Sequence, residues 1–257
     1  MLALPELGIE MKKSATAIVL FTRLPQDEAK FRDSIPESSK TGLFQRLITH
    51  VARQASQLGT ADFLFCLATD NPQPAQNGFY AQRGATFGER LVNLYQDLFK
   101  AGYERVLVVG NDCAELTTAD LEAAVRSLDD HECVVGPAED GGCYLIGLKG
   151  VLPGFLTLVS WQTQHTCSDL LRLVGRAQYS VALLDARLDL DTLDDIRRFA
   201  ARHRQNAGYH KLIIYLDGCL AAQRARREGM PLVEAPFISA LEEQRITWQI
   251  PPPVVHI

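Results

Sequence analysis

The sequence lacks several features that mark large classes of protein. It contains no run of about 18 apolar residues, so we expect no membrane span. Its first ten residues carry Glu6 and Glu10 without a basic start before an apolar stretch, so we expect no secretory signal peptide. None of the six cysteines stands in a C-x-x-C pair, which argues against zinc and favours reduced thiols over disulfides. Together these absences predict a cytoplasmic protein.

Positive charge is also in short supply. The chain carries 26 Lys and Arg against 31 Asp and Glu, which gives a net charge of −5 and a sequence pI of about 5.7. An acidic chain is poorly suited to holding nucleic acid or an acidic membrane by charge, so we expect neither as a partner. A local basic pocket for a phosphorylated small molecule remains compatible with this balance.

Three motifs of nucleotide and hydrolase chemistry are missing. The sequence has no G-x-x-x-x-G-K-[ST] loop, and no G-x-G-x-x-G follows its first apolar run. It also has no G-x-S-x-G turn to present a nucleophilic serine. P-loop enzymes, Rossmann dinucleotide enzymes and serine hydrolases therefore lose their usual sequence anchor.

The pattern that is present is an alternation of apolar strand-like runs and helical stripes. Thr86 with Glu89, and Thr192 with Asp195, have the spacing of capping boxes that begin helices. The periodicity predicts strands at 15–21, 63–68, 79–83, 106–109, 133–135, within 136–148 and at 179–184, and helices at 41–58, 86–101, from 117, at 167–174 and at 192–203. This order predicts a three-layer α/β/α sandwich with a mostly parallel sheet over residues 15–204.

Two further segments flank that predicted domain. Residues 1–14 are expected to form an N-terminal extension. Residues 205–257 are expected to form a C-terminal extension, packed on the domain or at a homodimer contact, with a late strand at 211–216 and a basic helix at 219–228.

Carboxylates gather at the expected ends of strands. Val106–Val109 is long enough for one buried strand, and Gly110-Asn111-Asp112 places an aspartate just past its carboxyl end, where ligands bind in open α/β sheets. Asp140, Asp189 and Asp191 also stand outside the expected helices and strands. Such oxygen ligands suit Mg²⁺ or Mn²⁺ beside a diphosphate. The alternative is structural, because aspartate is common in turns and caps, and Asp-Gly at 140–141 is typical of a hairpin turn.

The order of four segments resembles a known family. GNDCAEL at 110–116, GPAEDGGCYLIGL at 136–148, Trp-x-Thr at 161–163 and DLDTLDDI at 189–196 are similar to segments of bacterial proteins with the GT-A nucleotide-diphospho-sugar transferase fold. Those proteins are described as glycosyltransferases, and they are distant relatives of molybdenum-cofactor and phospholactate guanylyltransferases. The resemblance covers residues 15 to about 200, and the second segment is its most specific piece.

The resemblance implies a metal-dependent glycosyltransferase that binds a nucleotide-activated small molecule. Asp112 takes the place of a metal-binding aspartate, and Asp189 or Asp191 takes the place of a second ligand for Mg²⁺ or Mn²⁺. Asp140 falls by the acceptor site, and it is the expected catalytic residue together with Asp191. The expected nucleotide and substrate contacts are Arg23, Lys30, Arg32, Gly110, Asn111, Gly141, Gly142, Trp161 and Thr163.

The departures from the family pattern keep other functions open. Asp27-Glu28 replaces a Gly-Lys pair in the first loop, Ala114 replaces a proline, and Cys143 replaces a tyrosine. A nucleotidyltransferase that releases pyrophosphate is the second alternative. It ranks lower because such enzymes normally need a glycine-rich, basic first loop, which this chain lacks. A catalytically degenerate nucleotide-binding or assembly protein is the third alternative.

Overall fold

The computed structural model describes residues 14–31, 34–68 and 78–228. These residues form two compact units. The sheet unit comprises residues 14–23 and Leu47–Asp189, and the helical unit comprises Leu24–Arg46 and the residues from 190 onward. The extension expected over residues 1–14 and the end of the one expected over 205–257 fall outside the described residues, and the domain boundary expected at residue 204 stays a prediction.

The sheet unit is built on one sheet, in which seven strands are seen in the described part of the chain. Its order is β3-β2-β1-β4-β6-β5-β7. The strands are β1 (Thr16–Thr22), β2 (Asp62–Leu67), β3 (Phe79–Ala81), β4 (Arg105–Val109), β5 (Cys133–Pro137), β6 (Cys143–Lys149) and β7 (Val181–Leu183). Each lies where the apolar runs predicted a strand, with ends that differ by at most two residues.

One strand runs against the others. β6 is antiparallel to β4 and to β5, whereas β1 is parallel to β2 and β4, β2 to β3, and β5 to β7. β4 and β5 therefore point the same way, and the turn between β5 and β6 lies at the sheet edge where β4 ends. The hairpin turn predicted from Asp140-Gly141-Gly142 is confirmed at this place.

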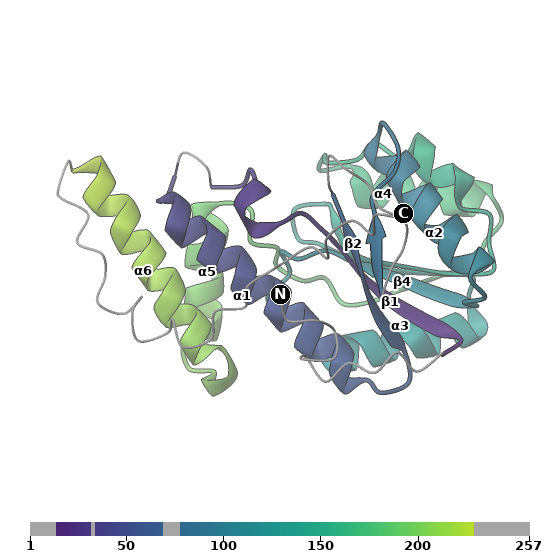
Figure 1. Ribbon diagram of the computed structural model, residues 1–257, viewed down its shortest axis with the longest axis horizontal. Coiled ribbons are helices and arrows are strands. Elements are labelled where there is room, and N and C mark those ends of the chain that lie inside the picture. The colour runs from purple at the N-terminus through teal and green to yellow at the C-terminus, as the bar shows by residue number, and fades with distance from the viewer. Residues whose placement is uncertain (1–13, 32–33, 69–77, 229–257) are drawn as a thin grey trace, which may run out of the picture. The chain divides into compact units, whose positions relative to one another are not determined.

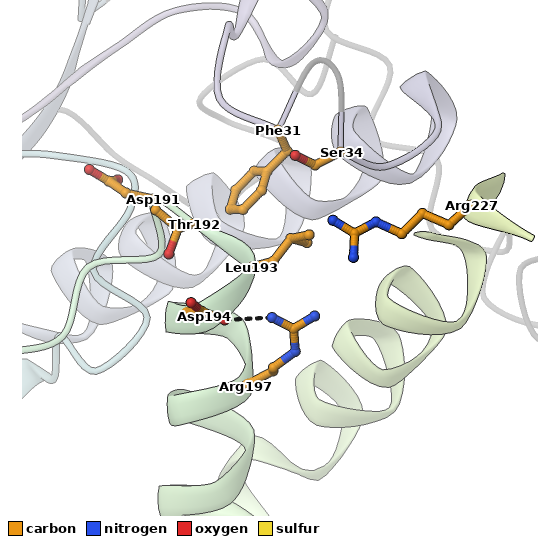
Figure 2. Close-up of a pocket in the computed structure, with 8 residues that line it drawn as sticks. All are labelled: Phe31, Ser34, Asp191, Thr192, Leu193, Asp194, Arg197 and Arg227. Atoms are coloured by element: carbon orange, nitrogen blue, oxygen red, sulfur yellow. Dashed lines mark hydrogen bonds and ion pairs between the residues drawn. The ribbon is translucent and has the colours of Figure 1, made fainter. Parts of the chain in front are cut away.

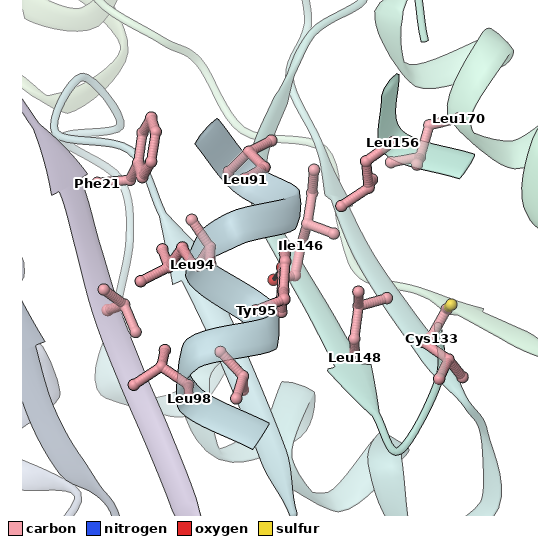
Figure 3. Packing of buried hydrophobic residues seen from close by; sticks show 14 of the residues in the cluster. Phe21, Leu91, Leu94, Tyr95, Leu98, Cys133, Ile146, Leu148, Leu156 and Leu170 are labelled. Carbon is pink, nitrogen blue, oxygen red and sulfur yellow. Dashed lines mark hydrogen bonds between the residues drawn. The ribbon is translucent and has the colours of Figure 1, made fainter. Parts of the chain in front are cut away.

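Helices cover both faces of the sheet, which confirms the three-layer sandwich. α2 (Phe87–Lys100) and α4 (Thr166–Arg176) lie on one face, and α3 (Thr118–Asp130) lies on the other (Figure 1). On the first face, Leu91, Leu94 and Leu98 of α2 pack against strand residues such as Ile146 and Leu148 (Figure 3). A short 3₁₀ segment, η3 (Pro153–Leu158), joins that core through Leu156.

The helix starts follow from local chemistry. Thr86 begins α2 and Thr192 begins α5 (Leu193–His203) with the capping boxes that the sequence predicted, and Thr117 with Asp120 makes a third at α3. Each box satisfies backbone N–H groups that would otherwise lack a partner in the first turn. Because Thr117 caps the first turn of α3, it fixes the end of the loop that runs from Gly110 to Leu116.

The helical unit corrects one prediction. Residues 211–216 are not a strand, because they belong to α6 (His210–Arg227). The buried residues of α6 are Ile213, Leu216, Cys219 and Gln223, and their spacing of three to four is the period of a helix. Ile214 is 39% exposed, so the apolar run is not buried from end to end as a central strand would be. The basic helix expected at 219–228 is the continuation of α6.

The remaining elements of the helical unit are short or shared. η2 (Pro25–Asp27) and η4 (Ala207–Tyr209) are single 3₁₀ turns. α1 (Glu37–Gln57) begins in this unit and continues in the sheet unit from Leu47 onward. α5 packs with α6, and the rings of Phe199, His203 and Tyr209 gather with centroid separations of 4.6–5.1 Å.

Candidate functional site

The end of β4 presents Asp112 as the sequence predicted. The Gly110 N–H donates to the Tyr144 carbonyl at 3.1 Å, which holds the chain against β6 just after the strand. A Cβ on Gly110 would lie 2.7 Å from Oδ1 of Asp112, so a larger residue at 110 would displace the carboxylate from its present position. Asn111, the residue between Gly110 and Asp112, is buried, with 8% of its surface exposed.

A buried carboxylate brings the Asp189 segment to this loop. Glu115, which is 5% exposed, accepts a hydrogen bond from the Leu188 N–H at 2.9 Å. One residue earlier, Arg187 forms an ion pair of 2.7 Å with Asp120 in the first turn of α3. Residues 73 positions apart in the chain are thereby fixed next to each other, and Asp189 follows directly after the fixed residue.

The Cys113 thiol has both aspartates in its electrostatic surroundings. Burial is the main cause that raises its pKa, and the negative charges of Asp189 and then Asp112 raise it further. Both carboxylates therefore lie within electrostatic range of one thiol in the sheet unit. This shared neighbour, together with the bond from Leu188 to Glu115, defines the candidate site.

The turn between β5 and β6 lies at the same place. Ala138 bridges to Arg187, and the Glu139 N–H donates to the Arg187 carbonyl at 2.9 Å, so the turn is tied to the segment that carries Asp189. Within the turn, the Gly142 N–H donates to Oδ1 of Asp140 at 2.8 Å, and Asp140 is exposed. The candidate site of the sheet unit thus comprises 110–113, 138–142 and 187–189.

Gly141 is required by the geometry of this turn. Its φ is +92°, a conformation that side-chain-bearing residues rarely adopt. An added Cβ would also stand 2.0 Å from the carbonyl oxygen of Gln164, which precedes α4. The turn and the start of α4 are therefore in direct contact.

The donor set suits a hard divalent ion. Mg²⁺ binds to proteins through one or two carboxylates and completes its shell with water and substrate phosphates, which is what Asp112 and Asp189 can offer. Within residues 14–31, 34–68 and 78–228 there is no group of three or more His, Cys, Asp or Glu side chains arranged to hold a metal ion. The fit is therefore to a metal that shares its shell with a ligand, and not to a site closed by protein alone.

Three more predicted contacts lie in the sheet unit. Arg23 is exposed directly after β1, at the edge where β4 also ends. The indole N–H of Trp161 donates to the Leu156 carbonyl at 2.8 Å, and its ring lies 5.0 Å from that of Phe87. Thr163 donates to the Ser160 carbonyl at 2.9 Å. Trp161 and Thr163 therefore have structural contacts, and their predicted role with substrate stays a prediction.

The predicted residues of the helical unit have different surroundings. Lys30 forms an ion pair with Asp191, so the predicted phosphate-binding cation is paired with a predicted metal ligand. Asp191 belongs to a different unit from Asp112 and Asp189, and its assignment as a ligand and catalytic residue stays a prediction. Arg32 lies outside the described residues.

Asp191 also borders a pocket of the helical unit with a volume of about 330 Å³. Figure 2 shows its carboxylate pointing away from Leu193 and from the guanidinium groups of Arg197 and Arg227. Arg197 is paired with Asp194 at the start of α5. The pocket is lined by Phe31, Ser34, Asp191, Thr192, Leu193, Asp194, Arg197 and Arg227.

Sequence reasoning missed the residues that hold the site together. The pairing of Glu115 with Leu188 and of Asp120 with Arg187 spans distances in sequence that periodicity does not report. The proximity of Cys143 and Cys167 was also missed, because neither stands in a C-x-x-C pair. The signal that could have pointed to Glu115 is its place in the GNDCAEL segment, three residues after Asp112.

Comparisons with known proteins gave one family match and several similar solved structures. Residues 47–163 match a family described as "Uncharacterized protein conserved in bacteria (DUF2064)". No curated protein matches the chain. A crystal structure described as a "putative nucleotide-diphospho-sugar transferase" from Desulfovibrio desulfuricans G20 is 23% identical, with a TM-score of 0.74, over 82% of this chain and 98% of that chain. The CMP:2-keto-3-deoxy-manno-octonic acid synthetase complexed with CTP is 14% identical, with a TM-score of 0.47, over 75% and 99%.

The first of these likenesses confirms the fold that the sequence predicted, a mixed α/β sandwich of the nucleotide-diphospho-sugar transferase type. In addition, no helix within the described residues is both long and apolar enough to span a bilayer.

Proposed function

We propose that the chain is a metal-dependent transferase that uses a nucleotide-diphospho-sugar donor. The observation that carries the proposal is the hydrogen bond between the Leu188 N–H and Glu115, because it fixes Asp189 beside the loop of Asp112. Two carboxylates prearranged at the edge where parallel strands end are suited to a divalent ion and a diphosphate. The likeness in fold to a protein described as a nucleotide-diphospho-sugar transferase supports the same choice of ligand.

The residues take the following roles in the proposal. Asp112 and Asp189 hold Mg²⁺ or Mn²⁺, which would neutralise the charge of the departing nucleoside diphosphate. Arg23, exposed at the end of β1, meets a phosphate oxygen. Asp140 receives the acceptor hydroxyl, because its carboxylate is exposed and is oriented by the Gly142 N–H. No protein nucleophile is needed, since positioning and charge stabilisation supply most of the catalysis.

The first loop favours this donor over a nucleoside triphosphate. Pro25–Asp27 forms a 3₁₀ turn, in which the Asp27 N–H donates to the Leu24 carbonyl at 2.9 Å. A proline turn followed by Asp27 and Glu28 offers neither flexible backbone nor early positive charge for a triphosphate. The nucleotidyltransferase is therefore the second candidate.

Titration calorimetry tests the proposal with a panel of nucleoside-diphosphate sugars and nucleoside triphosphates, each with and without Mn²⁺. We expect Mn²⁺-dependent binding of a nucleoside-diphosphate sugar. Release of pyrophosphate from a triphosphate would instead establish the nucleotidyltransferase, and no binding at millimolar ligand would establish a protein without this chemistry.

The variants Asp112→Asn and Asp189→Asn test the metal site directly. Each should lower Mn²⁺ affinity by at least about tenfold, while Asp130→Asn, at an exposed position at the end of α3, should not. The free energy of unfolding of the further variant Asp112→Ala should lie within about 1–2 kcal/mol of the parent's value, because Asp112 is not a core residue. Parent-like Mn²⁺ affinity in Asp112→Asn would remove Asp112 from the site.

A further inference from the structure

Two thiols from different elements meet beside the candidate site. Cys143 is the first residue of β6, directly after the Asp140-Gly141-Gly142 turn, and Cys167 is the second residue of α4. A backbone hydrogen bond of 2.9 Å from the Cys167 N–H to the Gly141 carbonyl joins their neighbourhoods. The close approach of Gly141 to Gln164 tightens the same contact.

The two side chains lie in one neighbourhood. Both pack against the edge of the core cluster beneath α2 and α4, and each thiol shifts the pKa of the other through a side-chain hydrogen bond. Both are partly exposed, whereas the other four cysteines (Cys66, Cys113, Cys133 and Cys219) are buried. A small polar oxidant therefore reaches this pair before it reaches any other thiol of the chain.

The two thiols differ in acidity. The hydrogen bond from Cys143 lowers the pKa of Cys167, which increases the thiolate fraction of Cys167. The hydrogen bond to Cys167 is the main cause that raises the pKa of Cys143, followed by burial and by the charges of Asp189 and Asp140. The position of Cys167 in the first turn of α4 also favours a negative charge there.

We propose that Cys143 and Cys167 form a reversible disulfide when the protein meets a hydroperoxide. The Cys167 thiolate attacks hydrogen peroxide, so that a sulfur–oxygen bond forms, the O–O bond breaks and hydroxide leaves to take up a proton as water. The Cys143 sulfur then attacks the sulfenic sulfur of Cys167, and its proton leaves with the displaced hydroxyl as a second water. In total, two thiols and one peroxide give one disulfide and two waters.

The backbone brings the two cysteines into one neighbourhood. A disulfide needs its sulfur atoms about 2 Å apart and its Cα atoms within about 7 Å of each other. Their backbones are already tied together through Gly141. The disulfide joins the start of α4 to the first residue after the turn that carries Asp140.

Mass spectrometry of the intact chain tests this inference without any assumption about activity. The native protein is treated with a small excess of hydrogen peroxide, blocked with N-ethylmaleimide and digested without reductant. We expect a peptide linked through 143 and 167 that disappears on treatment with dithiothreitol, and we expect it to form at least about tenfold faster than any other cysteine is oxidised. A first oxidation at one of the buried cysteines would overturn the proposal.

Variants separate the two roles. In Cys143→Ser, Cys167 should stop at the sulfenic acid and be trapped by dimedone, whereas Cys167→Ser should lose fast oxidation altogether. Cys219→Ser, at a buried position in α6, serves as the matched control and should still form the linked peptide. If Cys167 advanced to the sulfinic acid in the parent chain with Cys143 still reduced, the two thiols would not be a functional pair.

Discussion

Two aspartates that are separated by a single residue in sequence, Asp189 and Asp191, have different surroundings. Asp189 follows Leu188, whose backbone N–H donates a hydrogen bond to the buried Glu115. The charge of Asp189 raises the pKa of Cys113. Asp191 belongs to the helical unit and is paired with Lys30, and the side chains of that pair are 36% and 28% exposed. Proximity in sequence therefore does not assign these carboxylates the same role.

The difference lies in what orients each group. A buried hydrogen bond to a carboxylate fixes the backbone, and breaking it leaves a polar group without a partner, which costs about 1–3 kcal/mol. A surface ion pair contributes about 0–1 kcal/mol and can be exchanged for water or a ligand. The edge of the sheet unit is thus prearranged, whereas the Lys30–Asp191 pair can be replaced at small cost.

The largest expected effect comes from breaking the fixed arrangement. Glu115→Ala should lower the free energy of unfolding by about 2–3 kcal/mol, because it leaves the Leu188 N–H unsatisfied and opens a cavity. Urea unfolding measures this, with Glu104→Ala at an exposed position as the control, which should change by less than about 0.5 kcal/mol. Equal stability of the two variants would mean that Glu115 does not hold the Asp189 segment.

A loss of similar size is expected at the turn. Gly141→Ala should destabilise the protein by about 2–3 kcal/mol, since it adds a close approach to Gln164 to the strain of a φ of +92°. Gly150→Ala is the matched control, because Gly150 has a φ of +62° but nothing within 4 Å of an added Cβ. It should lose only about 1 kcal/mol. The difference between the two variants in urea unfolding measures the close approach alone.

The loop of Asp112 should also carry a pH dependence. His50 is hydrogen-bonded to the Leu116 carbonyl at 2.8 Å, and burial lowers its pKa from the usual 6.5. The folded state therefore favours the neutral ring. At pH values between the pKa of His50 in the folded protein and its pKa in the unfolded chain, the unfolded chain binds more protons. Stability contributed by neutral His50 is present above pH 6.5 and is lost as the pH falls through the folded pKa.

His50→Gln provides the comparison, because glutamine keeps an N–H donor for Leu116 and does not titrate. Urea unfolding at about pH 7.5 and about pH 5.5 should show a smaller drop for the variant than for the parent. An identical drop in both would place the pH dependence elsewhere.

The smallest effect is expected in the helical unit. Asp191→Asn should change the free energy of unfolding by less than about 1 kcal/mol, as should Asp194→Asn, which removes the similar surface pair with Arg197. Urea unfolding measures both changes. Mn²⁺ titration of the same variants sharpens the comparison. An equal loss of Mn²⁺ affinity in Asp189→Asn and Asp191→Asn would give the two aspartates the same role after all.

Local signals in the sequence predicted much of the fold. The apolar runs located the strands, the Thr86 and Thr192 boxes located two helix starts, and Asp140-Gly141 located the hairpin turn. These signals succeed because caps and turns are decided by residues within one turn of each other. The strand predicted from KLIIYL at 211–216 was wrong, because a short apolar run has the same appearance in a strand and in a buried helix face.

The site was only partly predictable. Asp112 lies at the strand end where the rule for open sheets places ligands, and Asp140 lies in its turn. The bond from Leu188 to Glu115 and the proximity of Cys143 and Cys167 depend on tertiary packing across long stretches of chain, for which a single sequence offers no periodic signal.

The reversed strand β6 limits how this molecule can diversify. It is paired on both sides, with Val109 and Gly136 both opposite Leu145. Adding or deleting one residue within it would exchange the two faces of the sheet for every side chain beyond the change, so we expect changes in length to be tolerated in the turn at 138–142 and not within the strand. Relatives that acquire a new substrate are therefore expected to differ in the length and composition of that loop, and laboratory libraries aimed at altered selectivity are best placed there.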